Sequence, residues 1–245
     1  MTPLTAGTDP AAWLASLTLA NGGHDSDEDQ WCVMEAAAYI ADEPHSDHPA
    51  CVSGVLTDFA INLNDRWKTE KRQLLKPFIP RLIGTRDDGL DETRGYLALD
   101  WLIRTYTPAW LDLAGLTEPA AELRALRRIV DVAAAESAGP VVREAQIKAA
   151  AAGAAARAAA GDAARAAAWD AARAAAWAAA GDAAWAAAWA AAWDAARAAA
   201  RDAAWAAARA AARDAARAAL APTVEALQAS ALDLLDRMID GRWPA

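Results

Sequence analysis

The amino-acid sequence predicts an all-α protein with three parts. We expect a compact multi-helix N-terminal domain over residues 1–138, a long alanine-rich repeat helix over 139–221 and a short C-terminal amphipathic helix over 222–245. Alanine, the strongest helix former, accounts for 75 of the 245 residues and for 48 of the 71 from Ala149 to Ala219. Elsewhere apolar residues recur at helical spacing between clear stop signals. No segment shows the alternation of apolar and polar residues that is typical of a half-buried strand.

The N-terminal domain contains a series of sequence signals for helix starts. Asp9 before Pro10 is typical of an N-cap and a first helical position, and the run from Ser26 to Glu28 supplies an acidic first turn. Similar signals recur further along the chain. The expected starts are Asp9-Pro10, Ser26 to Glu28, Asp47 to Pro49, Arg66, Asp91, Thr107-Pro108 and Thr117. The expected stops are Asn21-Gly22-Gly23, Pro77, Pro80 and Gly115.

The apolar positions within these segments indicate the buried faces of the helices. The residues expected to face inward are Trp13, Leu14, Leu17, Trp31, Met34, Ala38, Val52, Leu56, Phe59, Leu63, Leu97, Trp101, Leu123, Leu126 and Val130. The segment after Pro222 has the same spacing, with Leu227, Leu234 and Met238 on one face. We expect this last helix to pack on the N-terminal domain or on another subunit.

A strict four-residue repeat runs from Gly153 to Arg217. Its unit is x-(Asp/Ala)-Ala-Ala, where x is Trp, Arg or Gly. Four residues turn an ideal helix by about 400°, so the stripe of x residues moves around the helix by about 40° per repeat. A period above 3.6 favours a right-handed supercoil. Because the register continues through Gly161 and Gly181, we expect one continuous helix; breaks at these glycines would give helices of about 20 residues packed side by side.

The large side chains of the repeat predict a contact surface. Exposed tryptophan is costly unless it meets a partner, so we expect self-association or binding of a protein partner. The predicted interaction stripe comprises Trp169, Trp177, Trp185, Trp189, Trp193, Trp205, Arg173, Arg197 and Arg201. Interleaved aspartates weaken the positive field, which argues against nucleic acid as the partner. A stripe that moves around the helix also offers no constant face to a membrane surface.

Charge and composition argue against several classes of protein. The formal net charge is −9, and residues 1–140 carry 12 basic and 22 acidic groups, a balance that does not favour nucleic acid. The longest charge-free stretch of the repeat, residues 183–193, is too short to cross a bilayer. Residues 1–10 lack the features of a signal peptide, and two cysteines do not form a disulfide scaffold. We therefore expect a cytoplasmic, reduced protein.

One cluster has the residue types of a metal site. The spacings Cys32-x-x-Glu35 and His48-x-x-Cys51 place each pair on one side of a helical turn, and zinc binds these types. The alternative function is therefore a small zinc-binding module with ligands Cys32, Glu35, His48 and Cys51, close to His24 and His45. In an antiparallel hairpin, however, Cys32 would lie about 12 Å too far along its helix.

Two other interpretations of these residues stay open. The cysteines are accounted for equally well as small buried apolar residues, with Asp47 as an N-cap and His48 hydrogen-bonded to its loop. A nucleophilic Cys32 with a histidine base is the third interpretation. Because no phosphate-binding glycine loop, Gly-x-Ser-x-Gly or His-Glu-x-x-His motif occurs in the sequence, we expect a protein that is not an enzyme.

Several short segments together resemble a known group of proteins. They are Gly23-His24, Cys32-Val-Met-Glu35, Ser46-Asp47-His48-Pro49-x-Cys51, Asn64-Asp65 and Leu75-x-Pro77-x-Ile-Pro80. With the alanine-rich tail, they resemble uncharacterised proteins of actinobacteria and their phages, over nearly the whole chain. The resemblance implies a phage-related source and no particular activity. His45 departs from it, because a tryptophan is expected at that position.

Overall fold

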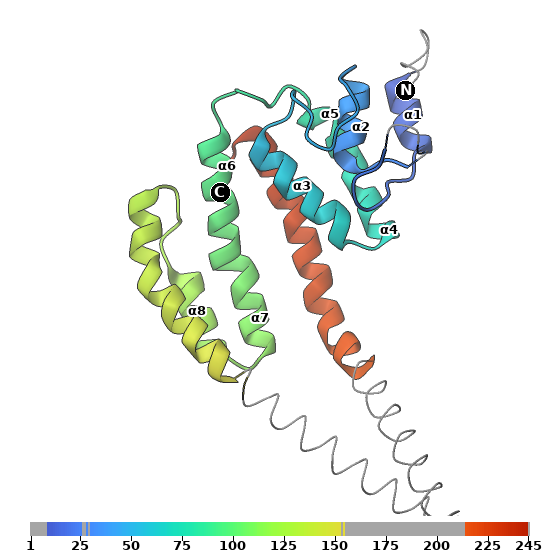
Figure 1. Cartoon of the computed structure of the whole chain (residues 1–245). Helices are drawn as coiled ribbons and strands as arrows, with labels where there is room; N and C mark the ends of the chain where they lie inside the picture. Colours follow the sequence, from blue (N-terminus) through green and yellow to red (C-terminus); the bar gives the residue numbers. More distant parts are fainter. Residues whose placement is uncertain (1–8, 26–27, 29, 153, 155–213, 245) are drawn as a thin grey trace, which may run out of the picture. The chain divides into compact units, whose positions relative to one another are not determined.

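A computed structural model describes residues 9–25, 28, 30–152, 154 and 214–244, and its regular elements are helices, as the sequence predicts (Figure 1). Within these ranges no helix combines the length and the apolar character needed to cross a membrane. The chain falls into two compact units. The first, called the body, comprises residues 1–107, 124–139 and 227–245. The second unit comprises residues 108–123 and 140–226.

The described helices follow in the order that the start signals predict. Their bounds are α1 Pro10–Ser16, α2 Val33–Ile40, α3 Gly54–Arg66, α4 Thr69–Arg72, the 3-10 helix η1 Gln73–Phe78, α5 Ile79–Leu82, α6 Asp91–Trp101, the π-helical turn η2 Leu102–Tyr106, α7 Thr107–Leu113 and α8 Thr117–Ala125. Residues 132–152 and 214–240 are also helical. The predicted domain boundaries after 138 and 221 thus fall inside these two helices.

The first helix starts as predicted, whereas the second and third start later. Asp9 caps α1 by accepting a hydrogen bond from the backbone N–H of Ala11 at 3.0 Å. The prediction of a start at Ser26 to Glu28 is wrong, because the cap of α2 is Cys32. Trp31, expected on this helix, instead pairs with Leu19 in an isolated bridge. Helix α3 is capped by Ser53 and not by Asp47.

Two further differences concern prolines and the end of α8. Pro77 and Pro80 do not close the basic stretch, because Pro77 lies within η1 and Pro80 occupies the first turn of α5, where no backbone N–H donor is needed. Val130 is 41% exposed, while its neighbour Ile129 is fully buried. Helix α8 ends at Ala125, so helical spacing no longer determines which of these residues faces inward.

The body has its main core between helices α1–α6 and the C-terminal helix. Leu56 of α3 and Leu97 of α6 are buried, and Leu234, Leu235 and Met238 of the C-terminal helix are fully buried in the same core. The last segment therefore packs on the body of its own chain. In Figure 1 this helix, drawn in red, runs beside α3 and α6.

The second unit contains the alanine-rich repeat tract, and some of its described residues are buried. Leu111, Ala120, Leu123 and Ala145 are buried in it. Residues 139–152 and 214–221 of the predicted repeat tract are helical. Its middle, residues 155–213, lies outside the described residues, and so does the predicted interaction stripe of Trp169, Trp177, Trp185, Trp189, Trp193, Trp205, Arg173, Arg197 and Arg201.

A buried arginine ties the C-terminal helix to the rest of the body. The side chain of Arg94 on α6 has no exposed surface, and it pairs with Asp88 at 2.5 Å and Asp91 at 3.0 Å. It also donates to the backbone carbonyls of Met238 at 3.0 Å and Ile239 at 3.3 Å, at the end of the C-terminal helix. A guanidinium can be buried at low cost only when its donors are satisfied in this way.

We predict that Arg94→Met destabilises the protein by about 3 kcal/mol or more, because it leaves carboxylates and helix-end carbonyls without a donor. Urea denaturation of the full chain measures this loss. The matched control is Arg81→Met, which also removes ion pairs to the C-terminal helix, with Asp236 and Asp240, but at the surface. We expect the control to cost less than about 1 kcal/mol. Equal losses in the two variants would contradict the role given to Arg94.

Candidate functional site

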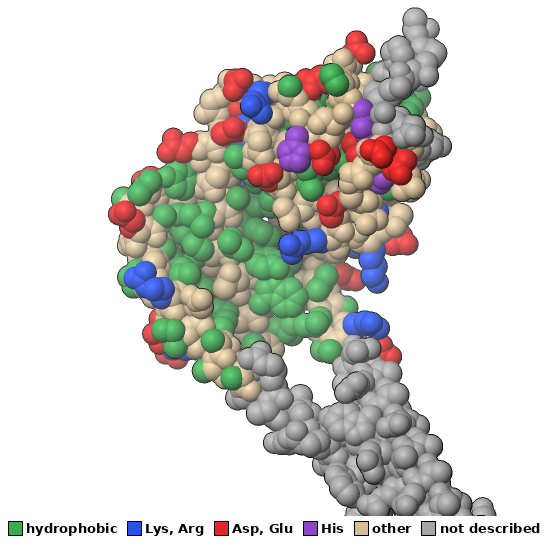
Figure 2. Space-filling model, viewed as in Figure 1, with side chains coloured by type: hydrophobic (Ala, Val, Ile, Leu, Met, Phe, Trp, Pro, Cys, Tyr) green, Lys and Arg blue, Asp and Glu red, His purple; other side chains and the backbone are tan. Residues whose placement is uncertain are grey.

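A cavity of about 1020 Å³ opens on the body beside the start of α2. The described residues that line it are Gly23, His24, Asp25, Glu28, Glu35, Asp42, Glu43, Pro44, His45, Ser46 and Asp47. Six of these are acidic, and none of them is lysine or arginine. Acidic and histidine side chains gather on the upper part of the face drawn in Figure 2. The cavity therefore carries a concentrated negative charge.

The buried carboxylate of Glu35 organises the walls of this cavity. Its side chain is only 1% exposed. It accepts hydrogen bonds from the backbone N–H groups of Cys32 and His24, both at 2.6 Å, and from Nδ1 of His24 at 2.9 Å. Its Oε1 lies 3.7 Å from Nε2 of His45. One carboxylate thus joins the start of α2 to two loops, and the charge is stabilised by the helix N-terminus.

The ring of His45 is fixed from several sides. Its Nε2 donates to the backbone carbonyl of His24 at 2.8 Å, and because a carbonyl only accepts, this nitrogen carries the proton. The ring packs edge-on against Trp31, with centroids 5.5 Å apart. Its other nitrogen, Nδ1, is buried and has no hydrogen-bond partner among the described residues. In the neutral ring, this atom is an acceptor without a donor.

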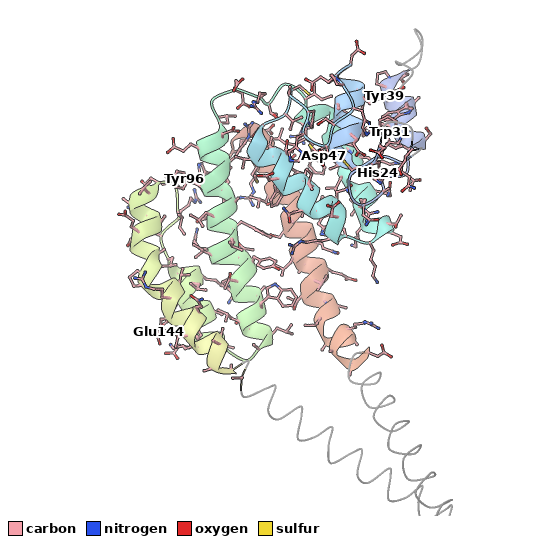
Figure 3. All side chains as sticks on the ribbon, viewed as in Figure 1. His24, Trp31, Tyr39, Asp47, Tyr96 and Glu144 are labelled. Atoms are coloured by element: carbon pink, nitrogen blue, oxygen red, sulfur yellow. The ribbon has the colours of Figure 1, made fainter. Side chains whose placement is uncertain are left out.

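An aromatic cluster supports the wall behind His45. Trp31 contacts Trp13 and Tyr39 at centroid separations of 5.5 and 5.0 Å, and Trp13 contacts Tyr39 at 4.5 Å. Figure 3 shows Trp31 and Tyr39 close to His24 and Asp47, at the end of the body that carries α1 and α2. These rings are rigid and apolar, so they hold the histidine loop in one place.

Helix α3 holds the loop that carries His24. The amide of Asn64 accepts from the N–H of Val33 at 3.3 Å and donates to the carbonyl of Ala20 at 2.8 Å. Asp65 accepts from the N–H of Gly22 at 2.8 Å. Gly23 follows, and a Cβ at this position would lie 3.3 Å from Oδ2 of Asp47. The loop can approach the Asp47 carboxylate this closely because Gly23 has no side chain.

The structure does not bring the four predicted zinc ligands together. Cys32 is buried, and its sulfur accepts the N–H of Glu35, which completes a capping box at the start of α2. His48 has a 63% exposed side chain and pairs with Asp47 at 2.8 Å. The partners of Glu35 are His24 and His45 instead. Among the described residues, no group of three or more His, Cys, Asp or Glu side chains is arranged to hold a metal ion.

Neither thiol is in an activating environment. Burial raises the pKa of Cys32 to about 12. Burial, and then the carboxylate of Glu43, raise the pKa of Cys51. Zinc ligands and nucleophiles need the thiolate, which these environments disfavour. Cys32 is better described as a helix cap within the core, close to the interpretation of the cysteines as small buried residues.

Three comparisons with known proteins found no relative of this chain. No protein-family model matches it, and no curated protein and no solved structure is significantly similar to it. The function has to be inferred from the chemistry of the cavity.

We predict that Glu35→Gln destabilises the protein by about 2 kcal/mol, because the amide cannot accept all of the donors that the carboxylate satisfies. Urea denaturation and amide hydrogen exchange measure the effect, and the loss of protection should centre on His24 and Cys32. The control is Glu70→Gln at an exposed position of α4, which we expect to change stability by less than about 0.5 kcal/mol. Unchanged protection at both amides would be incompatible with the described role of Glu35.

We predict that the thiol of Cys32 stays unreactive in the native protein. In a Cys51→Ser variant, a chromogenic disulfide reagent at pH 8 should react at least about a hundredfold more slowly than in denaturing urea, since little thiolate is present. In the natural protein, which keeps both cysteines, a chelator should leave the rate of thiol reaction unchanged. Rapid reaction released by the chelator would instead support the zinc site of Cys32, Glu35, His48 and Cys51.

Proposed function

We propose that this is a non-enzymatic partner-binding protein whose body accepts a cationic segment of a protein partner in the acidic cavity. The observation that carries the proposal is the lining itself: six acidic side chains without a described lysine or arginine among them. Field lines concentrate in a cleft of one charge sign, which attracts a cation and speeds its association.

The hydrogen bonds of Glu35 and the burial of Cys32 favour binding over catalysis as the function of the cavity. Glu35 is occupied by two backbone donors and the ring of His24, so its carboxylate maintains the shape of the site. The thiol of Cys32 is buried, and its pKa is raised to about 12, which argues against a nucleophile. A peptide cation is favoured over a metal ion, because the described residues contain no set of three ligands.

The alanine-rich tract supports the same class of function. We propose that its stripe of tryptophans and arginines mediates assembly or contacts a protein partner, since such side chains are costly when left exposed. Both cysteines are free, which suits a reducing cytoplasmic compartment. The resemblance to proteins of actinobacteria and their phages suggests a phage-related role.

The test is calorimetric titration of the full chain with a hexapeptide that contains both lysine and arginine. We expect binding that weakens as salt increases, because much of the attraction is Coulombic. The variant Asp25→Asn/Asp42→Asn removes two charges from the cavity lining at side chains that make no described hydrogen bond. Asparagine also tolerates the positive φ of 58° at position 42.

We expect this double variant to bind the peptide about tenfold more weakly. The matched control, Asp58→Asn/Glu70→Gln, removes the same charge from exposed positions outside the cavity lining and should bind nearly as the natural protein does. Absence of binding to the natural protein, or equal weakening in the two double variants, would refute the proposal.

A further inference from the structure

The loop between α1 and α2 contains the dipeptide Asn21-Gly22. We infer that this dipeptide is a site of spontaneous covalent modification, at which Asn21 loses ammonia and becomes aspartate or isoaspartate. Asp65 of α3 slows the reaction, because it holds the backbone N–H that has to react. The modified dipeptide is not part of the cavity lining, so the inference goes beyond the proposed function and does not rest on it.

The reaction needs only these two residues and water. The backbone nitrogen of Gly22 attacks Cγ of Asn21, the Cγ–Nδ2 bond breaks, and ammonia leaves with the proton of the Gly22 N–H. The product is a cyclic succinimide. Water then opens the ring at Cγ, which gives aspartate, or at the backbone carbonyl, which gives isoaspartate. No oxidation or reduction takes place, and the attack is unhindered because glycine has no side chain.

The structure leaves the two reacting residues accessible. Asn21 is exposed, and its side chain makes no hydrogen bond to another described residue. Gly22 has a φ of 84°, and a Cβ at this position would meet no atom within 4 Å. There is therefore room for the ring to close, and water can reach it.

Asp65 controls the nitrogen that attacks. Its Oδ1 accepts the N–H of Gly22 at 2.8 Å, so the proton and the plane of this peptide are held towards α3. The carboxylate also opposes the negative charge that develops on the nitrogen as the proton leaves. The attack therefore proceeds from conformations in which this hydrogen bond has opened. A hydrogen bond to a charged group changes the population of such conformations by about tenfold.

Modification alters the segment that carries His24. Either product adds a negative charge at position 21, and isoaspartate also inserts its Cβ carbon into the main chain. The carbonyl of Ala20 and the N–H of Gly22, on either side of this position, are both hydrogen-bonded to α3. An additional main-chain atom between these two points disturbs both bonds. We therefore expect the N–H of His24, which donates to Glu35 in the natural protein, to lose protection.

The test is incubation of the full chain in neutral buffer at physiological temperature, followed by peptic mapping in acid and mass spectrometry. We expect Asn21 to convert, about tenfold more slowly than in a free peptide of residues 19–25. Both aspartate and isoaspartate should form. Asn62, which is followed by leucine within α3, is the internal reference and should stay unmodified.

Matched variants test the role of Asp65. Asp65→Ala removes the acceptor at an exposed position and should speed the conversion of Asn21 about tenfold. Asp58→Ala removes the same charge from another exposed position of α3 and should keep the natural rate. Asn21→Gln should abolish the conversion. If Asp65→Ala does not fold, Asp65→Asn, which keeps an acceptor oxygen but loses the charge, should still give a rate above the natural one.

Each part of the inference can be overturned separately. Absence of conversion at Asn21 after the free peptide has converted completely overturns the modification site. Equal rates in the natural protein and the Asp65 variants, or slower conversion in the variants, overturn the protective role of Asp65. Hydrogen exchange of the purified isoaspartate form tests the consequence, and an unchanged rate at the His24 amide would contradict it.

Discussion

The cavity end of the body depends on one buried negative charge. A carboxylate as deeply buried as that of Glu35 is tolerable only when donors surround it. Backbone N–H groups of Cys32 and His24 and the ring of His24 supply these donors, so the charge dictates where α2 begins and how the preceding loop folds. The acidic cavity is a consequence of that arrangement, because the loops that carry its lining are positioned by the same carboxylate.

A buried positive charge has the corresponding role elsewhere in the body. Arg94 joins α6 to the last turn of the C-terminal helix through carbonyls and two aspartates. Its guanidinium donates hydrogen bonds to the carboxylate of Asp88 and thereby lowers the pKa of that group. A lowered folded-state pKa means that this stabilisation is complete above the ordinary pKa of an aspartate, about 3.9, and is lost as the pH falls through the lower value. Glu35 and Arg94 thus fix two different parts of the body, because each is a buried charge that is stabilised by hydrogen bonds from several segments.

The sequence predicts the helices better than it predicts the site, for a physical reason. Helix starts and buried faces depend on neighbours three or four residues apart, and these are visible in segments such as Asp9 to Leu14. The spacing of Cys32 and Glu35 has two possible meanings, since a capping box and a metal-binding pair can both place their two residues three positions apart. The N-cap of α2 is difficult to predict because Cys32 stands where serine or threonine is usual. The lining of the cavity could not be predicted, because its acidic residues come from α2 and from two loops that are separate in sequence, and one of these loops is held by Asn64 and Asp65 of α3.

The same geometry accounts for several residue types in the short segments Gly23-His24, Cys32-Val-Met-Glu35 and Asn64-Asp65. Gly23 allows close approach to Asp47, Cys32 and Glu35 form the cap, and Asn64 fastens the loop before His24. At position 45, where the sequence analysis expected tryptophan, the ring of His45 packs edge-on against Trp31. A tryptophan has no acceptor nitrogen, since its indole N–H only donates. The histidine in this chain therefore places a buried nitrogen acceptor, Nδ1, in the wall of the cavity, where a tryptophan would have none.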